Sequence, residues 1–200
     1  MSIYTLKARF QDRLRPVVVR LAAAGVTANQ ITVAAAAVSI LLGAVLWMWP
    51  VPALFALIPV WMLLRMALNA IDGMLAREHG QKSALGGYLN EIGDVVSDAA
   101  LYAPFALVAP LSQVWVGAAV VLALLTEFAG ILGVVHGNGR RYDGPMGKSD
   151  RALAFGLLAA WIAVAGGALP GWAAWVLPVL CALMVWTVVN RVRAGLRPAG

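Results

Sequence analysis

The segment NAIDGMLAREHGQKSALGGYLNEIGD, residues 69–94, places polar and charged side chains between two long apolar runs. The 200 residues are 62% hydrophobic and only 12% charged. Apolar runs of about 20 residues are long enough to cross a ~30 Å hydrocarbon core as α-helices, and lipid cannot satisfy the edges of open strands. The composition therefore predicts an all-α integral membrane protein, and not a soluble domain.

The apolar runs predict six transmembrane helices within a single domain that covers residues 1–200. The predicted spans are 30–49, 51–76, 86–109, 112–136, 152–168 and 172–191. Residues 1–24 precede them as a predicted amphipathic helix at the membrane surface, because Ile3, Leu6 and Phe10 recur at helical spacing opposite Lys7 and Arg13. We therefore expect a six-helix bundle over residues 30–191 that follows an interfacial helix.

Basic residues are confined to one side of the predicted bundle. Of the 15 Lys and Arg residues, only Arg65 falls in the interior of a span, Arg191 is the last residue of the sixth, and the connections near Pro50, Leu111 and Pro170 contain none. The positive-inside rule then predicts that both termini are cytoplasmic. The net charge of +6 reflects this topology and contact with anionic lipids, and it does not indicate a nucleic-acid partner.

Polar residues recur at helical spacing on two neighbouring spans. Asn69 and Asp72 share one face at the cytoplasmic end of the second span, and Asn90, Asp94 and Asp98 share one face of the third. Because the connection is short, these helices are expected to be antiparallel neighbours with converging polar faces. Ionisable groups in a membrane are costly and usually functional, and oxygen ligands without paired His or Cys suit a hard cation such as Mg²⁺ or Mn²⁺.

Glycines and one arginine accompany these oxygens. Gly73 and Gly86 lack side chains, so that a helix or a flat ligand could approach the backbone closely. The guanidinium of Arg77 is suited to binding phosphate oxygens through two parallel hydrogen bonds. A cation site, an arginine and open backbone together indicate a binding site for a charged phosphoanhydride.

The spacing N-x2-D-G-x2-A-R-x8-G-x3-N-x3-D, from Asn69 to Asp94, resembles the signature of the CDP-alcohol phosphotransferases, also called CDP-alcohol phosphatidyltransferases. Their pattern has Asp at all four acidic positions, and every spacing matches. The six spans, the leading amphipathic helix and the sequence GVTANQIT at 25–32 also resemble that family. The resemblance thus covers nearly the whole chain. It is closest to a small branch of that family whose members lie in the bacterial inner membrane.

This resemblance implies an enzyme of phospholipid biosynthesis. It would transfer a phosphatidyl or similar phospho-alcohol group from a CDP-alcohol to a hydroxyl acceptor and release CMP. An active site at the membrane interface favours CDP-diacylglycerol as the donor, because its tails lie in lipid and its nucleotide in water. A homodimer is expected from the resemblance alone.

The resemblance also implies roles for individual residues. The four motif positions, Asn69, Asp72, Asn90 and Asp94, would hold divalent ions, and Asp94 would be the general base for the acceptor hydroxyl. Arg77 would hold phosphate oxygens. The residues expected to line the cytidine side are Gly73, Ala76 and Gly86.

Asn69 and Asn90 depart from the family pattern. The four motif positions carry a charge of −2 here, against −4 in the family, although Asn keeps an oxygen ligand. Glu91 and Asp98 are the nearest carboxylates that could compensate, and the alternative is that they are solvated or bonded locally. The sequence therefore leaves open whether one or two ions are bound.

Other basic residues are candidates for the substrate site. Arg65 either faces a cytoplasmic cavity or extends toward the interface. Lys148 and Arg151, in GKSDRA, either line an acceptor pocket, where they would suit a phosphorylated acceptor, or are charges that follow the positive-inside rule. Glu127 either forms hydrogen bonds between helices or lines the cavity.

Three other readings compete with an active transferase. The polar residues could form a structural ion-pair network, in which the two Asn make interhelical hydrogen bonds. The chain could be a non-catalytic family member that binds a lipid or a partner, since Asn replaces two Asp. It could also be a small ion transporter, but its polar residues would then extend through the membrane, whereas these gather at one end.

Overall fold

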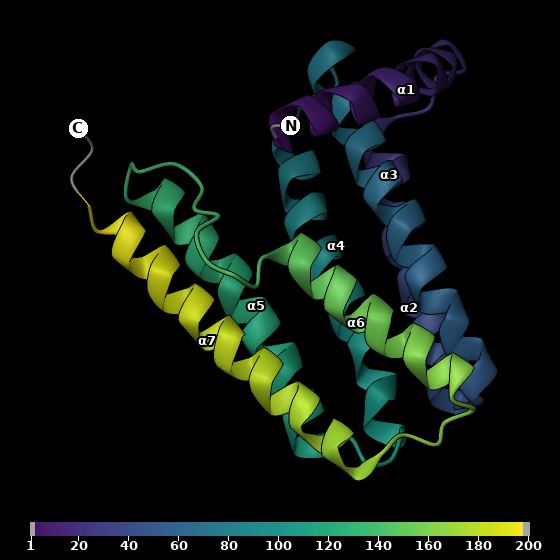
Figure 1. Cartoon of the computed structure of the whole chain (residues 1–200). Helices are drawn as coiled ribbons and strands as arrows, with labels where there is room; N and C mark the ends of the chain where they lie inside the picture. The colour runs from purple at the N-terminus through teal and green to yellow at the C-terminus, as the bar shows by residue number, and fades with distance from the viewer. Residues whose placement is uncertain (1–2, 198–200) are drawn as a thin grey trace.

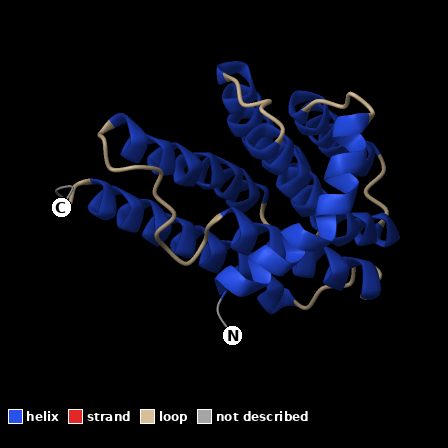
Figure 2. Cartoon of the chain, turned by 90° about the horizontal axis from the view of Figure 1, so that it is seen from above, coloured by secondary structure: helices blue, strands red, loops and turns tan. Residues whose placement is uncertain are grey.

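The computed structural model describes the backbone of residues 3–197 and the side chains from Phe10 onward. The described chain is helical and contains no strand, as Figure 2 shows from above. Its seven α-helices are α1 (Ile3–Ala23), α2 (Ala28–Met48), α3 (Leu57–Glu78), α4 (Ala84–Tyr102), α5 (Gln113–Val135), α6 (Lys148–Val164) and α7 (Val176–Gly195). Three short 3₁₀ helices, η1 (Pro52–Ala56), η2 (Ala103–Leu107) and η3 (Gly171–Trp175), adjoin α3, α4 and α7.

Local hydrogen bonds set where the helices begin. The Thr27 hydroxyl accepts from the backbone N–H of Gln30 at 3.2 Å, and the Gln30 side chain accepts in return from the Thr27 N–H at 2.9 Å, so α2 starts with a capping box. At the start of α6, the Gly147 N–H donates to Asp150 at 2.9 Å. Because of this contact α6 begins at Lys148, whereas the sequence predicted that this span begins at residue 152. Lys148 therefore lies in the first helical turn.

The helices pack as two groups with α6 between them (Figure 1). In one group α2 contacts α3 and α4, and in the other α5 and α7 lie side by side. The helix α1 packs against α3. The connections after α3 and α5 lie toward the upper end of the molecule in Figure 1, as does α1, and those after α2, α4 and α6 lie toward the lower end. The basic loops therefore gather at one end.

Close backbone approach fixes the position of α4 against α2. A Cβ added at Gly43 of α2 would lie 2.2 Å from the backbone oxygen of Ala100 in α4, so only glycine fits there. One helical turn after Asp98, Tyr102 stacks on Phe155 at 3.8 Å between ring centroids, and Phe105 meets Phe155 edge-on at 5.3 Å. This apolar core holds α4 and α6 together below the polar segment.

Four described helical segments are long and apolar enough to cross a membrane. They are Ala28–Met48, Pro52–Glu78, Gln113–Val135 and Gly171–Gly195. The other two predicted spans correspond to α4, which carries Glu91, Asp94 and Asp98, and to α6, which has 17 residues. Large apolar side chains such as Leu63 and Val121 are exposed, as expected for helices that face lipid.

Candidate functional site

The polar faces of α3 and α4 meet, as their helical spacing predicts. The Arg65 guanidinium donates to Asp98 at 2.6 Å and to the Asp94 carboxylate at 3.0 Å. The Asn69 amide nitrogen donates to the same Asp94 oxygen at 3.3 Å. Arg65 is only 5% exposed and lines a cavity, so its side chain points inward and does not extend toward the interface.

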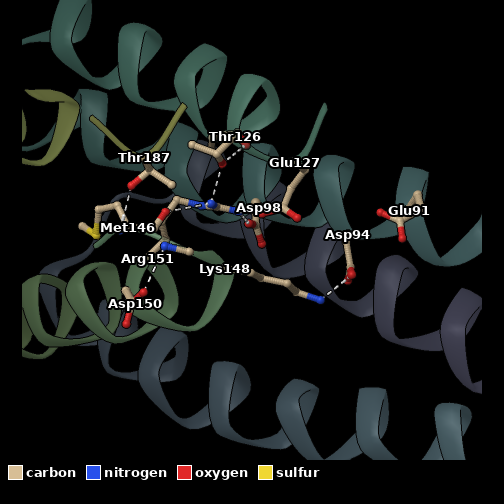
Figure 3. Close-up of polar contacts among 12 residues, drawn as sticks. Glu91, Asp94, Asp98, Thr126, Glu127, Met146, Lys148, Asp150, Arg151 and Thr187 are labelled. Carbon is tan, nitrogen blue, oxygen red and sulfur yellow. Dashed lines mark hydrogen bonds and ion pairs between the residues drawn. The ribbon is translucent and has the colours of Figure 1, made fainter. Parts of the chain in front are cut away.

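Arg151 of α6 joins this pair of helices to α5 (Figure 3). Its guanidinium lies 3.2 Å from Asp98 and 3.0 Å from Glu127, and it donates to the Thr126 hydroxyl at 2.7 Å. Arg151 is fully buried, and both of its terminal guanidinium nitrogens bond within the protein, whereas its Nε has no partner. The sequence placed Arg151 either in an acceptor pocket or among the charges that follow the positive-inside rule, and the structure shows it at the centre of a buried ion-pair network.

The network extends to both sides of Arg151. Glu127 also lies 3.0 Å from Arg140 and 3.6 Å from Arg191, and Arg140 pairs in turn with Glu91. At the other end, Lys148 pairs with Asp94. The result is a chain of alternating charges in the order Glu91, Arg140, Glu127, Arg151, Asp98, Arg65, Asp94 and Lys148.

Asp72 lies beside this network without an ion-pair partner among the described side chains. It is 6% exposed, and one carboxylate oxygen accepts from the Thr32 hydroxyl of α2 at 2.7 Å. With Asp72 included, the site holds five acidic and five basic side chains, so its formal charge is zero. The chain itself balances charges that are costly to bury unpaired.

The motif glycines make room for neighbouring side chains. A Cβ at Gly73 would lie 2.9 Å from the Arg77 guanidinium, and a Cβ at Gly86 would lie 2.8 Å from the amide oxygen of Asn29. Arg77 itself is exposed, at the end of α3. Ala76 is half-buried and packs toward the apolar contact with α1.

Two cavities adjoin the network, and Lys148 lines both. The larger, of about 550 Å³, lies between α3 and α6; Met62, Leu63 and Leu157 form its apolar wall, and its polar residues include Arg65 and Asn69. The smaller, of about 320 Å³, is more polar, and its lining includes Glu127, Arg140, Tyr142, Lys148, Asp150 and Arg191. Arg151 lines neither cavity.

The sequence did not identify Arg140, Tyr142 and Arg191 as site residues. Arg140 and Arg191 looked like ordinary charges at span ends, and their partner Glu127 lies 64 positions before Arg191. The available signal was Glu127 itself, because an acid in an otherwise apolar helix needs cationic partners.

The oxygen ligands present fit one divalent cation better than two. Among the described residues, no three His, Cys, Asp or Glu side chains form a group that could hold a metal ion. Asp72 retains one carboxylate oxygen free of side-chain partners, and amide oxygens of Asn69 and Asn90 are the other hard donors of the motif. Glu91 and Asp98, the proposed compensating ligands, are instead paired with arginines.

Comparisons with known proteins agree on the family and the fold. The family model for CDP-alcohol phosphatidyltransferase matches residues 25–189. Inner membrane protein YnbA of Escherichia coli (strain K12) is 44% identical over 197 residues, which cover 97% of this chain and 96% of that protein.

Two solved structures share the fold. Phosphatidylinositol phosphate synthase (PgsA1) of Mycobacterium tuberculosis with CDP-DAG bound has a TM-score of 0.69 at 15% identity, covering 92% of this chain and 97% of that chain. The same synthase in complex with manganese and citrate has a TM-score of 0.71 at 16% identity, covering 92% of both chains. At these identities the likeness concerns the fold.

Proposed function

Because the chain belongs to the CDP-alcohol phosphatidyltransferase family, we propose that it transfers a phosphatidyl group from CDP-diacylglycerol to a hydroxyl acceptor and releases CMP. The observation that carries this proposal is the position of Asp94. Its carboxylate is oriented by Arg65, Asn69 and Lys148. All three of these residues line the larger cavity, and Lys148 also lines the smaller one. The base is thus held by side chains of the cavity walls, and its partner Lys148 would link reactants in the two cavities.

The larger cavity suits a lipid donor. Its apolar wall, formed by residues such as Leu63 and Leu157, would accept an acyl chain, and Arg65 and Lys148 would face the donor phosphates. The synthase with CDP-DAG bound shares this fold, which supports a CDP-linked lipid as the donor. Arg77, exposed at the end of α3, would hold nucleotide phosphate from the aqueous side.

The smaller cavity suits a phosphorylated alcohol as acceptor. Arg140, Lys148 and Arg191 supply positive charge there, and Tyr142 and Ser149 supply hydroxyl groups. Arginines bind phosphate oxygens through paired, charge-assisted hydrogen bonds. An acceptor phosphate held by these residues would leave a free hydroxyl directed toward Lys148 and Asp94.

The proposed step is a displacement at phosphorus. Asp94 would take the proton of the acceptor hydroxyl, whose oxygen forms a bond to the phosphorus that carries diacylglycerol. The bond from that phosphorus to the bridging oxygen breaks, and CMP leaves with the electron pair. Arg65 would remain hydrogen-bonded to Asp94 and Asp98, which keeps the carboxylate oriented.

Asp72, with amide oxygens of Asn69 and Asn90, would hold a Mg²⁺ or Mn²⁺ ion. The synthase solved with manganese supports a divalent ion in this fold. When bound, the ion would polarise phosphate oxygens of the donor.

For the membrane arrangement, we propose that α4 and α6 cross the bilayer together with the four apolar segments. Their polar residues lie inside the bundle, where Asp98 and Arg151 are buried and paired, so lipid would meet only their apolar faces. The basic loops would be cytoplasmic, and α1 would lie on that surface. The similarity to an inner membrane protein supports the inner membrane as the location.

A second candidate function is lipid binding without turnover. It rests on Asn69 and Asn90, which remove two charges that the family motif carries. The ion-pair network would then be purely structural.

An acceptor panel separates these two functions. CMP release is measured for the purified protein in CDP-diacylglycerol liposomes with Mn²⁺, using phosphorylated polyols and their unphosphorylated counterparts. The transferase proposal expects release that depends on the acceptor and is fastest with a phosphorylated polyol. CMP release that does not depend on the acceptor would contradict transfer to a hydroxyl acceptor. No CMP release at any Mn²⁺ concentration would favour the binding function.

A further inference from the structure

Lys148 binds the carboxylate that the sequence assigned both to the base and to a metal ion. It lies in the first turn of α6, and its ammonium group pairs with one oxygen of Asp94 (Figure 3). The other oxygen of Asp94 accepts from Arg65 at 3.0 Å and from the Asn69 amide at 3.3 Å. Both oxygens are therefore engaged by donors of this chain.

Asn69 adds an independent constraint. Its amide nitrogen donates to Asp94 at 3.3 Å, so the atom that faces the carboxylate is a hydrogen-bond donor and not a metal ligand. An aspartate at position 69 would instead face Asp94 as a like charge and would require a cation between the two. Asn69 removes a like charge beside Asp94, and Lys148 neutralises the Asp94 carboxylate, so neither leaves a negative charge that a metal ion at Asp94 must balance.

The charge of the whole site leads to the same conclusion. Five acids and five bases already cancel, so two divalent ions would add four uncompensated positive charges in a largely buried region. Uncompensated charge in such a region is strongly unfavourable. One ion at Asp72 would pair with the acid of this site that has no ion-pair partner among the described side chains.

We propose that Lys148 supplies at Asp94 the positive charge of a second divalent ion, so that the chain binds one divalent ion, at Asp72. This proposal rests on the proposed transferase function for the role of Asp94 as the base. What it states independently of catalysis is that one divalent ion binds and that Lys148 pairs with Asp94. In this role Lys148 acts through the Asp94 carboxylate, which is separate from the contact with substrate phosphates proposed above.

Mn²⁺ binding tests the proposal without turnover. The full chain in lipid nanodiscs is titrated with Mn²⁺ alone, and free Mn²⁺ is quantified by electron paramagnetic resonance. The wild type should bind one ion, and Asp72→Asn should lose that binding. Lys148→Met should bind Mn²⁺ at least about tenfold more tightly, because a nearby positive charge is removed. Lys148→Arg keeps the charge and should behave as the wild type, and Lys82→Met, at an exposed loop lysine, is the matched control.

A triple variant gives the sharpest outcome. The variant Asn69→Asp/Asn90→Asp/Lys148→Met restores two carboxylates and removes the lysine, so it should bind two Mn²⁺ per chain. The double variant Asn69→Asp/Asn90→Asp keeps Lys148, and it should bind the second ion at least about tenfold more weakly than the triple variant. Two ions on the wild type, or equal Mn²⁺ affinity for Lys148→Met and Lys82→Met, would overturn the proposal. One ion on a protein that never releases CMP would refute the transferase function and leave the metal count standing.

Discussion

Replacing Arg151 by methionine removes the central cation of the buried ion-pair network. The fully buried guanidinium contacts Asp98 at 3.2 Å, Glu127 at 3.0 Å and the Thr126 hydroxyl at 2.7 Å. Removing one partner of a buried pair typically costs about 3–5 kcal/mol. Asp98 keeps Arg65 at 2.6 Å and Glu127 keeps Arg140 at 3.0 Å, so neither acid is left unpaired. We therefore expect the low end of that range, a loss of about 3 kcal/mol in the free energy of unfolding, or roughly two orders of magnitude in the equilibrium constant.

The assay is equilibrium unfolding in detergent micelles with increasing sodium dodecyl sulfate, followed by circular dichroism. Arg193→Met is the control, because Arg193 is an exposed basic residue near the same end of the bundle, and it should unfold like the wild type. Adding Glu127→Gln to Arg151→Met should cost less than the sum of the two single changes, because the acid that lost a partner is then neutral. A loss in Arg151→Met no greater than in Arg193→Met would refute the view that the network is buried and paired.

The remaining predictions concern packing, topology and the acceptor. Gly43→Ala should destabilise the bundle by about 1–3 kcal/mol through overpacking, whereas Gly93→Ala, whose added Cβ would meet its nearest neighbour at 3.6 Å, should be tolerated; unfolding of the two variants compares them. Reporters fused after Arg77 and after Gly139 should both be active in the cytoplasm, and an external location for either would break the six-span arrangement. Arg140→Met should raise the KM for a phosphorylated acceptor about tenfold with the KM for the donor little changed, and equal effects on both would remove Arg140 from the acceptor site.

Helical periodicity explains why the meeting of α3 and α4 could be predicted. Asn69, on α3, and Asp94, on α4, lie on faces that the spacing fixes, and the short connection makes the helices neighbours. The alternation of basic and uncharged connections likewise predicted that loops alternate between two ends. Helical spacing and the charge of each connection are both local properties of the sequence, which is why they could be predicted.

The contributions of α5, α6 and α7 could not be predicted in the same way. The partners of Glu127, namely Arg140, Arg151 and Arg191, depend on how three helices pack, and no spacing encodes that. The position of Lys148 depends on a cap that starts α6 before the apolar run begins. The amide orientation of Asn69 depends on the acid that it meets. Sequence reasoning therefore located the motif but missed much of its electrostatic environment.

The most direct measurement of the proposed activity is a mass balance on the reaction. Wild-type protein and Asp94→Asn are reconstituted in liposomes that contain CDP-diacylglycerol, a phosphorylated polyol and Mn²⁺, and CMP and the new phospholipid are quantified together by mass spectrometry. We predict that the wild type forms the two products in equal amounts. Asp94→Asn should form both at least about a hundredfold more slowly while it still binds the donor, because general-base catalysis contributes about 10²–10⁴-fold. Equal rates for the two proteins, or CMP without a matching phospholipid, would contradict transfer by an Asp94-based site.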